Sequence, residues 1–251
     1  MGAILILGCR VDAVGREAAV DRIVALAEAG GAALVVTLGV EMVMAAQRDE
    51  RFRDAINAAE LVTCDTIGLL LVSRLRGGPL RERVTGVDLL GALAARSAAG
   101  ADLRLYLLGG AGDTAQRAAE ALRRAAPGAA IVGARDGYFS EAESPAVAAA
   151  VRASGANVLL AGLGSPKQEL WLRRHLAASA CGVGIGIGGS LDVYAGNVVR
   201  APRLVQRLGL EWAYRLITQP RRWRRQLALP RFALAALRET LTLRNERNVR
   251  T

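Results

Sequence analysis

The sequence is poor in the residues that most often hold metals or form disulfides. Its 251 residues include one histidine, His175, and three cysteines, Cys9, Cys64 and Cys181. The cysteines have neither paired nor metal-type spacing, and a single histidine cannot form a zinc cluster. The absence of any Asp-x-Asp pair weakens the case for a divalent metal held by clustered carboxylates. We therefore predict buried, reduced thiols, a structural His175 and no metal cofactor.

Long apolar runs and a leader segment are also missing. No window contains the roughly 18 uncharged apolar residues that a membrane-spanning helix requires. The first ten residues are too short and lack the basic start of a signal peptide. With 52% hydrophobic residues, the chain is long enough to bury a large core as one α/β domain, with or without an appendage. These features favour a cytoplasmic globular protein.

Negative charge is scarce in one part of the chain. The formal net charge is +10, and residues 200–251 contain 13 Arg and 3 Glu, whereas residues 1–199 contain 20 basic and 20 acidic side chains. A neutral body with a basic tail predicts an anionic partner: a lipid surface, a nucleic acid or a phosphorylated substrate. We therefore expect a body at 1–199 and an Arg-rich appendage at 200–251.

Strand and helix patterns alternate through the body. Strands are predicted at 3–7, 33–37, 61–64, 103–108, 130–134, 157–163 and 183–187. Helices are predicted at 15–28, 40–47, 50–58, 67–75, 87–98, 114–125, 146–153 and 167–177. This alternation predicts an α/β fold with a Rossmann-like parallel sheet and helices on both faces. Ligands of such sheets bind beyond the carboxyl ends of the strands. Five candidate residues fall there: Thr37, Asp65, Gly110, Ser165 and Gly189.

The segment 159–171 carries the strongest local signal. An apolar strand ends there in a glycine turn, and Ser165 is predicted to cap a helix whose first residue is Pro166. The start of such a helix attracts anions. Lys167 and Gln168 add a cation and an amide, so phosphate or pyrophosphate is the expected guest. The alternative is a turn that only redirects the chain, since short glycine motifs are common.

Asp65 and a nearby polar loop offer groups for chemistry. The carboxylate of Asp65, after an apolar strand, could act as a general base toward a hydroxyl group. Its alternative role is to cap the helix that begins near Ile67. Arg81 and Arg83 could clamp a phosphate in bidentate fashion, or be solvated.

Two further turns offer ligand contacts. The turn at 136–139 exposes the ring of Tyr138, which could stack on a base or anchor an ordinary loop. The turn at 188–192, Gly-Gly-Ser-Leu-Asp, is similar to a phosphate or ribose site. Its glycines permit close approach of the backbone, and Gly189 and Asp192 are the candidate contacts.

The tail has an amphipathic helical pattern. Apolar residues recur at three- and four-residue steps with arginines between them, and Pro230 is predicted to kink the run. These apolar residues are Trp223, Leu227, Leu234, Leu237 and Leu241. The tail is either a helix packed on the body or an interfacial helix on anionic lipid, where each basic residue contributes about 1 kcal/mol. We favour the membrane, because the tail carries Trp and Leu as well as charge.

Several blocks occur in an order and spacing that resembles the bacterial WecG/TagA/CpsF glycosyltransferases. The blocks lie at 37–43, 65–68, 81–88, 133–139, 162–169 (Gly-Leu-Gly-Ser-Pro-Lys-Gln-Glu), 188–192, 200–202 and 209–215. The resemblance implies an inverting transfer of a sugar, often N-acetylmannosamine or its uronic acid, from a UDP-sugar. The implied acceptor is a polyprenyl-diphosphate-linked saccharide, in the synthesis of cell-surface polysaccharide or teichoic-acid-type polymers.

Carried onto matching positions, the resemblance implies roles for single residues. Asp65 would be the catalytic base. Thr37 and Gln168 would contact the sugar, and Arg83 would touch the substrate phosphates. Three tail arginines would neutralise the leaving or lipid diphosphate: Arg215, Arg222 and Arg225. The other predicted substrate contacts are Gly39, Gly110, Tyr138, Gly164, Ser165, Lys167, Glu169, Gly189 and Asp192.

The resemblance also implies how and where the enzyme works. Family members look metal-independent and need no cofactor, so helix N-termini and Arg or Lys would stabilise the departing diphosphate. They are peripheral on the cytoplasmic face of the membrane, which the appendage meets through anionic lipid. No nucleic-acid partner is expected, and the apolar segment Ile67–Leu75 leaves room for self-association as a homo-oligomer.

Two positions depart from the family pattern. The family usually carries Asn where this chain has Gly39, and Gly where it has Thr66. Loss of the amide removes a donor and an acceptor from the predicted sugar pocket, which is consistent with a different sugar or reduced activity.

Two other functions fit parts of the sequence. A nicotinamide-dependent dehydrogenase suits a glycine-rich α/β chain. Against it, neither 109–112 nor 162–164 completes Gly-x-Gly-x-x-Gly, and no ribose-binding acid follows about 20 residues on. A nucleic-acid-binding protein would use the Arg-rich tail.

Overall fold

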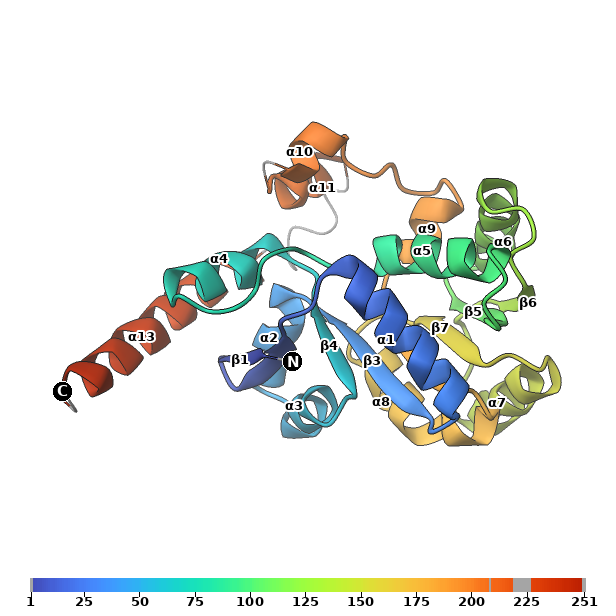
Figure 1. The fold of residues 1–251 in the computed structure, drawn as a ribbon, viewed down its shortest axis with the longest axis horizontal. Helices are drawn as coiled ribbons and strands as arrows, with labels where there is room; N and C mark the ends of the chain where they lie inside the picture. Colours follow the sequence, from blue (N-terminus) through green and yellow to red (C-terminus); the bar gives the residue numbers. More distant parts are fainter. Residues whose placement is uncertain (1, 208, 219–226, 250–251) are drawn as a thin grey trace.

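One parallel sheet organises the chain (Figure 1), whose computed structural model describes residues 2–207, 209–218 and 227–249. Within these residues, six strands pair in the order β4-β3-β8-β7-β5-β6, and every pair is parallel. The strands are β3 (Ala33–Leu38), β4 (Leu61–Cys64), β5 (Leu105–Gly109), β6 (Ile131–Arg135), β7 (Val158–Gly162) and β8 (Val183–Gly186). The predicted Rossmann-like parallel sheet is confirmed.

Helices cover both faces of the sheet, as predicted (Figure 1). One face carries α1 (Arg16–Ala29), α5 (Gly86–Ala98), α6 (Thr114–Ala125) and α9 (Ser190–Tyr194). The other carries α2 (Val40–Ala46), α3 (Glu50–Asn57), α7 (Ser144–Ala153) and α8 (Lys167–His175). Two short 3-10 helices, η1 (Glu141–Glu143) and η2 (Ala177–Ser179), flank α7 and α8. Successive strand residues point to opposite faces. Leu160 of β7 therefore packs in the core under α1 and α5, and Leu159 packs in the core under α3 and α8.

The amino-terminal segment lies outside this sheet. β1 (Ala3–Ile6) and β2 (Cys9–Asp12) form an antiparallel hairpin, which packs through β2 on β4 and α3. Leu7 and Gly8 form its two-residue turn with φ of 49° and 74°, as hairpin turns of this kind require. The prediction of a strand at 3–7 is correct in kind, but it does not include β2. Arg10 and Asp12 interrupt any apolar run there, so no strand pattern is visible.

The other predicted elements begin and end within two residues of those observed. The body also contains α9, which the sequence patterns did not predict because it spans only five residues. The three cysteines are free and buried, as predicted. His175 is structural: its ring lies 5.1 Å from that of Trp171, centroid to centroid.

The appendage contains α10 (Arg203–Arg207), α11 (Glu211–Thr218) and α13 (Ala228–Val249) among its described residues. α13 packs on α2 and on α4 (Ile67–Leu75), and its far end extends beyond the body (Figure 1). The predicted helical tail is therefore confirmed for this segment. Pro230 is the third residue of α13, where its missing N–H would have no helical partner; because part of the predicted run lies outside the described residues, the kink at Pro230 stays a prediction. Trp223 lies outside the described residues.

No described helix is both long enough and apolar enough to cross a membrane. α4 exposes Leu71 and Leu75, so the apolar segment predicted for self-association is open to solvent in the single chain.

Candidate active site

Glycines bring the carboxyl ends of the central strands close together. A Cβ on Gly109 would lie 2.5 Å from the carbonyl oxygen of Gly162, and a Cβ on Gly162 would lie 2.8 Å from that of Gly188. From β5 the chain continues to β6 at the edge of the sheet, whereas from β7 it continues to β8 on the opposite side. The neighbouring strands β5 and β7 therefore connect to strands on opposite sides of the sheet. Ligands of open parallel sheets bind at such switch points, which makes this edge the candidate site.

Asp65 lies at this edge, at the end of β4 and beside the end of β3. Its backbone N–H donates to the carbonyl oxygen of Leu38 at 2.9 Å. A Cβ on Gly39 would lie 4.0 Å from Asp65 Oδ2, so the carboxylate faces the residue that follows β3. Asp65 is half-buried and precedes Thr66, the N-cap residue of α4. Its carboxylate thus stands where two strand ends meet.

The two departures from the family pattern, Gly39 and Thr66, lie against each other. A Cβ on Gly39 would lie 3.3 Å from Thr66 Cγ2. Thr66 Oγ1 accepts a hydrogen bond from the N–H of Val40 at 3.3 Å, across the gap between the two strand ends. The Thr66 side chain therefore occupies space that a side chain at position 39 would enter. The polar group absent at Gly39 is offset by a hydroxyl from the neighbouring strand end.

The loop after α4 carries Arg83 to the same edge. Val84 donates its N–H to Cys64 O at 2.7 Å, and Thr63 Oγ1 donates to Val84 O at 2.9 Å. Arg83 precedes Val84 and Asp65 follows Cys64, so the two charged residues lie next to the two ends of this backbone hydrogen bond. The pKa of the Cys64 thiol is raised to about 12: burial raises it most, the charge of Asp65 also raises it, and Arg83 lowers it. The charges of Asp65 and Arg83 therefore both lie close enough to Cys64 to change its pKa. The Cys64 thiol stays protonated and unreactive.

Arg83 also joins the body to the appendage. Its guanidinium pairs with the Glu211 carboxylate of α11 at 3.3 Å and donates to the carbonyl oxygen of Gln206 at 3.4 Å. Both side chains of the pair are largely buried. A substrate phosphate at Arg83 would share this guanidinium with Glu211. Arg81, by contrast, donates to Gly78 O and Leu80 O within its own loop.

β8 makes room for polar side chains of α8. In its sequence Val-Gly-Ile-Gly, the valine and isoleucine join one core, and the glycines face α8. A Cβ on Gly186 would lie 2.7 Å from Gln168 Nε2 and 2.9 Å from Glu169 Oε1. The helix therefore packs directly on the β8 backbone, with two polar residues against Gly186.

Thr37 and Gln168, the predicted sugar contacts, both lie against Gly186. Thr37 Oγ1 donates to Gly186 O at 2.7 Å. Gln168 Nε2 donates to Glu169 Oε1 at 2.7 Å, and Gln168 Oε1 accepts from the N–H of Gly188 at 3.1 Å. Gln168 is only 2% exposed, so these bonds fix its position.

The turn before α8 differs from the prediction. α8 begins at Lys167, Pro166 is its N-cap residue and no side chain caps it, so the predicted capping by Ser165 is wrong. Gly164, with φ of 79°, turns the chain so that its carbonyl oxygen accepts from the N–H of Gln168 at 2.9 Å. This backbone bond closes the first turn without a side chain.

Three predicted contacts gather at the ends of β5, β6 and β7. The N–H of Gly137 donates to Gly110 O at 2.9 Å, and Lys167 Nζ donates to Gly137 O at 3.4 Å. The Lys167 ammonium also lies 4.8 Å from the centroid of the Phe139 ring. Tyr138 is 79% exposed beside them. This cluster thus offers a cation and an exposed aromatic ring.

Gly189 and Asp192 lie at the start of α9, where Gly189 is the N-cap residue. The carboxyl of Asp192 accepts from Asn197 Nδ2 at 3.2 Å, and its carbonyl oxygen accepts from the N–H groups of Asn197 and Val198. Asp192 therefore secures the turn after α9. Of the tail arginines, Arg222 and Arg225 lie outside the described residues, and only the backbone of Arg215 is described.

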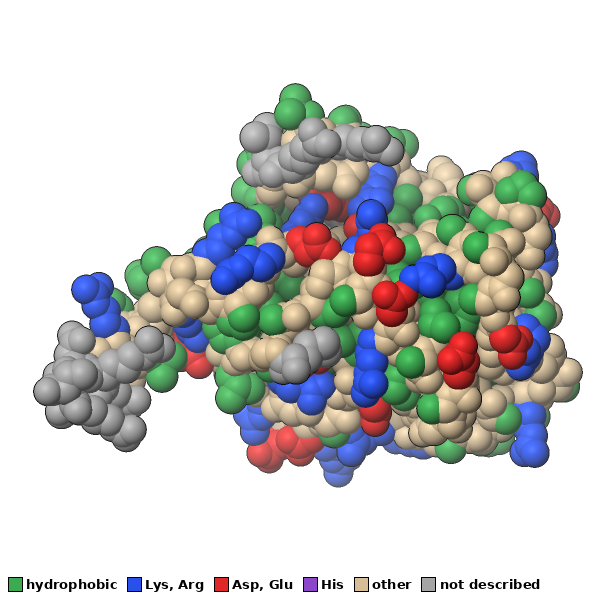
Figure 2. Space-filling model, viewed as in Figure 1, with side chains coloured by type: hydrophobic (Ala, Val, Ile, Leu, Met, Phe, Trp, Pro, Cys, Tyr) green, Lys and Arg blue, Asp and Glu red, His purple; other side chains and the backbone are tan. Residues whose placement is uncertain are grey.

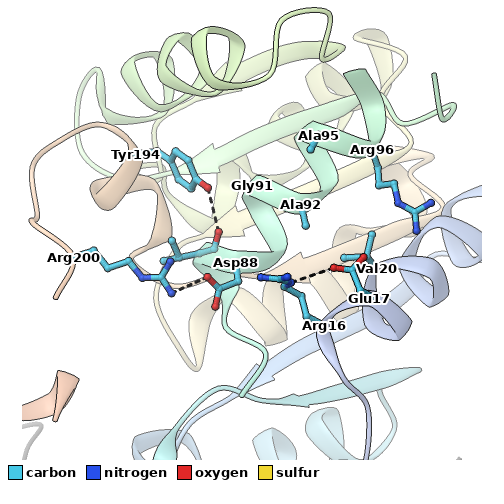
Figure 3. A pocket seen from close by; sticks show the side chains of 11 residues that line it. Arg16, Glu17, Val20, Asp88, Gly91, Ala92, Ala95, Arg96, Tyr194 and Arg200 are labelled. Atoms are coloured by element: carbon cyan, nitrogen blue, oxygen red, sulfur yellow. Dashed lines mark hydrogen bonds and ion pairs between the residues drawn. The ribbon is translucent and has the colours of Figure 1, made fainter. Parts of the chain in front are cut away.

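A separate hollow of about 490 Å³ lies between α1 and α5 (Figure 3). Each arginine that lines it is paired with a carboxylate. The pairs are Arg200 with Asp88 at 2.8 Å, Arg16 with Glu17 at 3.4 Å, and Arg96 with Asp21. Because these charges satisfy one another, we place the candidate site at the strand ends and not in this hollow. The described residues contain no group of three or more His, Cys, Asp or Glu that could hold a metal ion.

Sequence reasoning did not single out Gly186 or Glu211. The alternating glycines of β8 were a signal for the first, since a strand face without side chains admits a close helix. No local signal exists for the second, because its partner Arg83 is 128 residues away in sequence.

The comparisons with known proteins give the class of this chain, a glycosyltransferase. Residues 4–246 match the Glycosyl transferase WecG/TagA/CpsF family, and the chain belongs to this family, as predicted. It is 37% identical over 208 residues to the N-acetylglucosaminyldiphosphoundecaprenol N-acetyl-beta-D-mannosaminyltransferase of Bacillus spizizenii. The aligned region covers 82% of this chain and 79% of the relative. It is 35% identical over 213 residues to the protein of the same name from Bacillus subtilis, which covers 82% and 80% respectively.

Proposed function

We propose that this glycosyltransferase moves N-acetylmannosamine, or a closely similar sugar, from a UDP-sugar to N-acetylglucosamine on a polyprenyl diphosphate. The names of the two Bacillus relatives support both the sugar and the acceptor. The observation that carries the proposal is the position of Asp65, at the meeting point of two strand ends and next to the loop of Arg83.

Asp65 would act as the general base of an inverting transfer. Its carboxylate takes the proton of the acceptor hydroxyl, whose oxygen forms the new bond to the anomeric carbon. The bond from that carbon to the diphosphate oxygen breaks on the opposite face of the sugar, and UDP leaves with the electron pair. Asp65 is half-buried at a strand end, and such a position suits this role.

Cationic side chains would stabilise the departing diphosphate without a metal ion. Arg83 and Lys167 are described cations close to the strand ends. The arginines of the appendage, Arg215, Arg222 and Arg225, would add positive charge. Charge-assisted hydrogen bonds of this kind stabilise negative charge that develops in a transition state. Transfer that persists in EDTA would support metal independence, and recovery that requires added Mg²⁺ or Mn²⁺ would contradict it.

The appendage would hold the enzyme on the cytoplasmic face of an anionic membrane. Leu234, Leu237 and Leu241 are 53%, 48% and 52% exposed, whereas Phe232 and Ala236 face the body and are buried. Figure 2 shows basic and hydrophobic side chains interspersed over α4 and α13. Leucines at one-turn spacing beside arginines form the pattern of a helix that lies in a lipid interface.

A panel of UDP-sugars tests the function directly. We expect UDP release from UDP-N-acetylmannosamine only when a short polyprenyl-diphosphate N-acetylglucosamine is present, with a disaccharide-lipid product. A thermal shift with NAD but not with UDP would favour the dehydrogenase instead. Salt-sensitive RNA binding without vesicle binding or sugar transfer would favour a nucleic-acid-binding protein.

A further inference from the structure

Glu169 is a buried acid that the proposed chemistry does not use. It is 0% exposed, and no described cation pairs with it. Its own backbone N–H and the Ser165 side chain, like the Gln168 amide, act on the carboxyl and lower its pKa, but Oε2 has no described donor within hydrogen-bonding distance. Burial raises the pKa of Glu169 more than the hydrogen bond from Gln168 lowers it. A carboxyl in this setting favours its uncharged form.

An apolar residue of similar size would be the more stable choice at this position. Buried polar groups with unmet hydrogen bonds lower stability, and replacing them by well-packed apolar groups is often neutral or favourable. Neighbouring side chains of α8 follow that rule: Leu172 and Leu176 fill the space over Gly184, one step back along β8. The presence of Glu169 therefore requires a reason other than packing.

Its side-chain contact with Gln168 gives that reason. Glu169 Oε1 accepts from Gln168 Nε2, and Gln168 Oε1 accepts from the N–H of Gly188, which begins the turn after β8 with φ of 52°. Both ends of the Gln168 amide are thus occupied, so the amide can take only one orientation. The second N–H of the amide makes no hydrogen bond among the described residues.

We propose that Glu169 is the positioning residue for Gln168 and for the turn after β8. The side-chain oxygen Oε1 of Glu169 orients the Gln168 amide, and the amide orients the turn. The inference rests on the proposed function for the statement that Gln168 contacts the donor sugar. Glu169 itself, with no exposed surface, touches no substrate. It acts only through Gln168.

Two substitutions separate positioning from charge. Glu169→Gln keeps the carbonyl oxygen and the shape of an uncharged acid, so it should retain kcat and the donor KM within about 3-fold. Glu169→Leu removes the acceptor at similar volume and should weaken donor use by roughly 10- to 100-fold, as small misplacements in a site do. The acceptor KM should stay unchanged and Tm should stay equal or rise. A Glu169→Leu enzyme with normal donor kinetics would overturn the proposal, as would a Glu169→Gln enzyme as poor as Glu169→Leu.

A double-mutant cycle tests whether Glu169 acts through Gln168. In a Gln168→Ala background, Glu169→Leu should have no further effect on the donor kcat/KM, because its only route is already removed. Additive losses would contradict this route.

Hydrogen exchange tests the structural half without any substrate. In folded Glu169→Leu, the Gly188 amide should exchange at least several-fold faster than in the wild type, and in Glu169→Gln it should not. Equal Gly188 protection in all three proteins would overturn the proposal even if sugar transfer is confirmed. A wild type that transfers no sugar would instead refute the proposed function, and the exchange rates alone would then decide whether Glu169 positions Gln168 and the turn.

Discussion

The strand-end cluster and the appendage are built in different ways. Around Gly186, the polar groups of Thr37, Gln168 and Glu169 are buried, bonded to backbone or to one another, and pressed against glycine. The appendage is attached by the buried side chains of Phe232 and Ala236 and by ion pairs with Arg76 and Arg83, and it leaves leucines exposed. The comparison teaches that the body holds a fixed geometry at the predicted sugar contacts, whereas the appendage offers charge and exposed apolar surface.

The attachments of the appendage show where it can act. Near α13, Arg76 Nη2 pairs with Glu239 at 2.6 Å, and Glu239 accepts from the N–H of Leu7 at 3.0 Å, far from the strand ends. Near α11, Glu211 pairs with Arg83 beside Asp65. The second attachment therefore joins the appendage to the loop beside Asp65, and the first holds the helix that exposes leucine.

The largest expected effect comes from the body. Asp65→Asn keeps the size of the side chain but removes the base, and should lower turnover by roughly 100-fold or more. Transfer rates of purified, folded protein measure this. Asp113→Asn is the matched control, since Asp113 is also near a strand end but 72% exposed and paired within its own helix. Near-normal transfer by Asp65→Asn would remove Asp65 as the base.

The link between the two regions should have an intermediate effect. Glu211→Gln leaves Arg83 without the carboxylate that holds it, so we expect about a 10-fold loss in kcat/KM, as a misplaced substrate-binding group produces. Glu120→Gln on the exposed face of α6 should change nothing. If the two variants behave alike, Arg83 does not depend on α11.

A smaller effect is expected from the exposed leucines. Leu237→Glu puts a charge among the exposed leucines of α13 and should reduce co-sedimentation with anionic vesicles by roughly 5-fold, with little change in Tm. Leu5→Glu provides the control, because Leu5 is 60% exposed on the body hairpin. An equal loss in both variants, or none in Leu237→Glu, would argue against α13 as the membrane contact.

The smallest effect concerns the pH dependence of stability. Burial raises the pKa of Glu169 above its ordinary value of 4.5, so the folded state binds this proton more tightly than the unfolded state. Its contribution is complete below the unfolded pKa and is lost as pH rises through the folded pKa, by at most about 1.4 kcal/mol per pH unit. Glu169→Gln should lack this loss. Parallel Tm curves for the two proteins from acid to neutral pH would show that Glu169 does not titrate in this way.

Most of the fold could be predicted because buried parallel strands are continuous apolar runs. Val35, Leu107 and Leu160 lie in such runs, and parallel strands necessarily end at one edge, so Thr37 and Asp65 lie near the ends of neighbouring strands. The hairpin partner Cys9–Asp12 could not be predicted in this way, since its charged residues interrupt the pattern. The pairing of Arg83 with Glu211 and the contact of Gly39 with Thr66 depend on how distant segments pack, which no local pattern records.

A crystal structure of the full chain with a UDP-sugar bound tests the central claim most directly. We predict that the sugar lies at the carboxyl ends of β3, β4 and β8, with a hydroxyl or the acetamido group in hydrogen-bonding distance of Gln168 or Thr37 and the anomeric carbon facing Asp65. A donor bound instead in the hollow of Asp88 and Arg200, between α1 and α5, would contradict it.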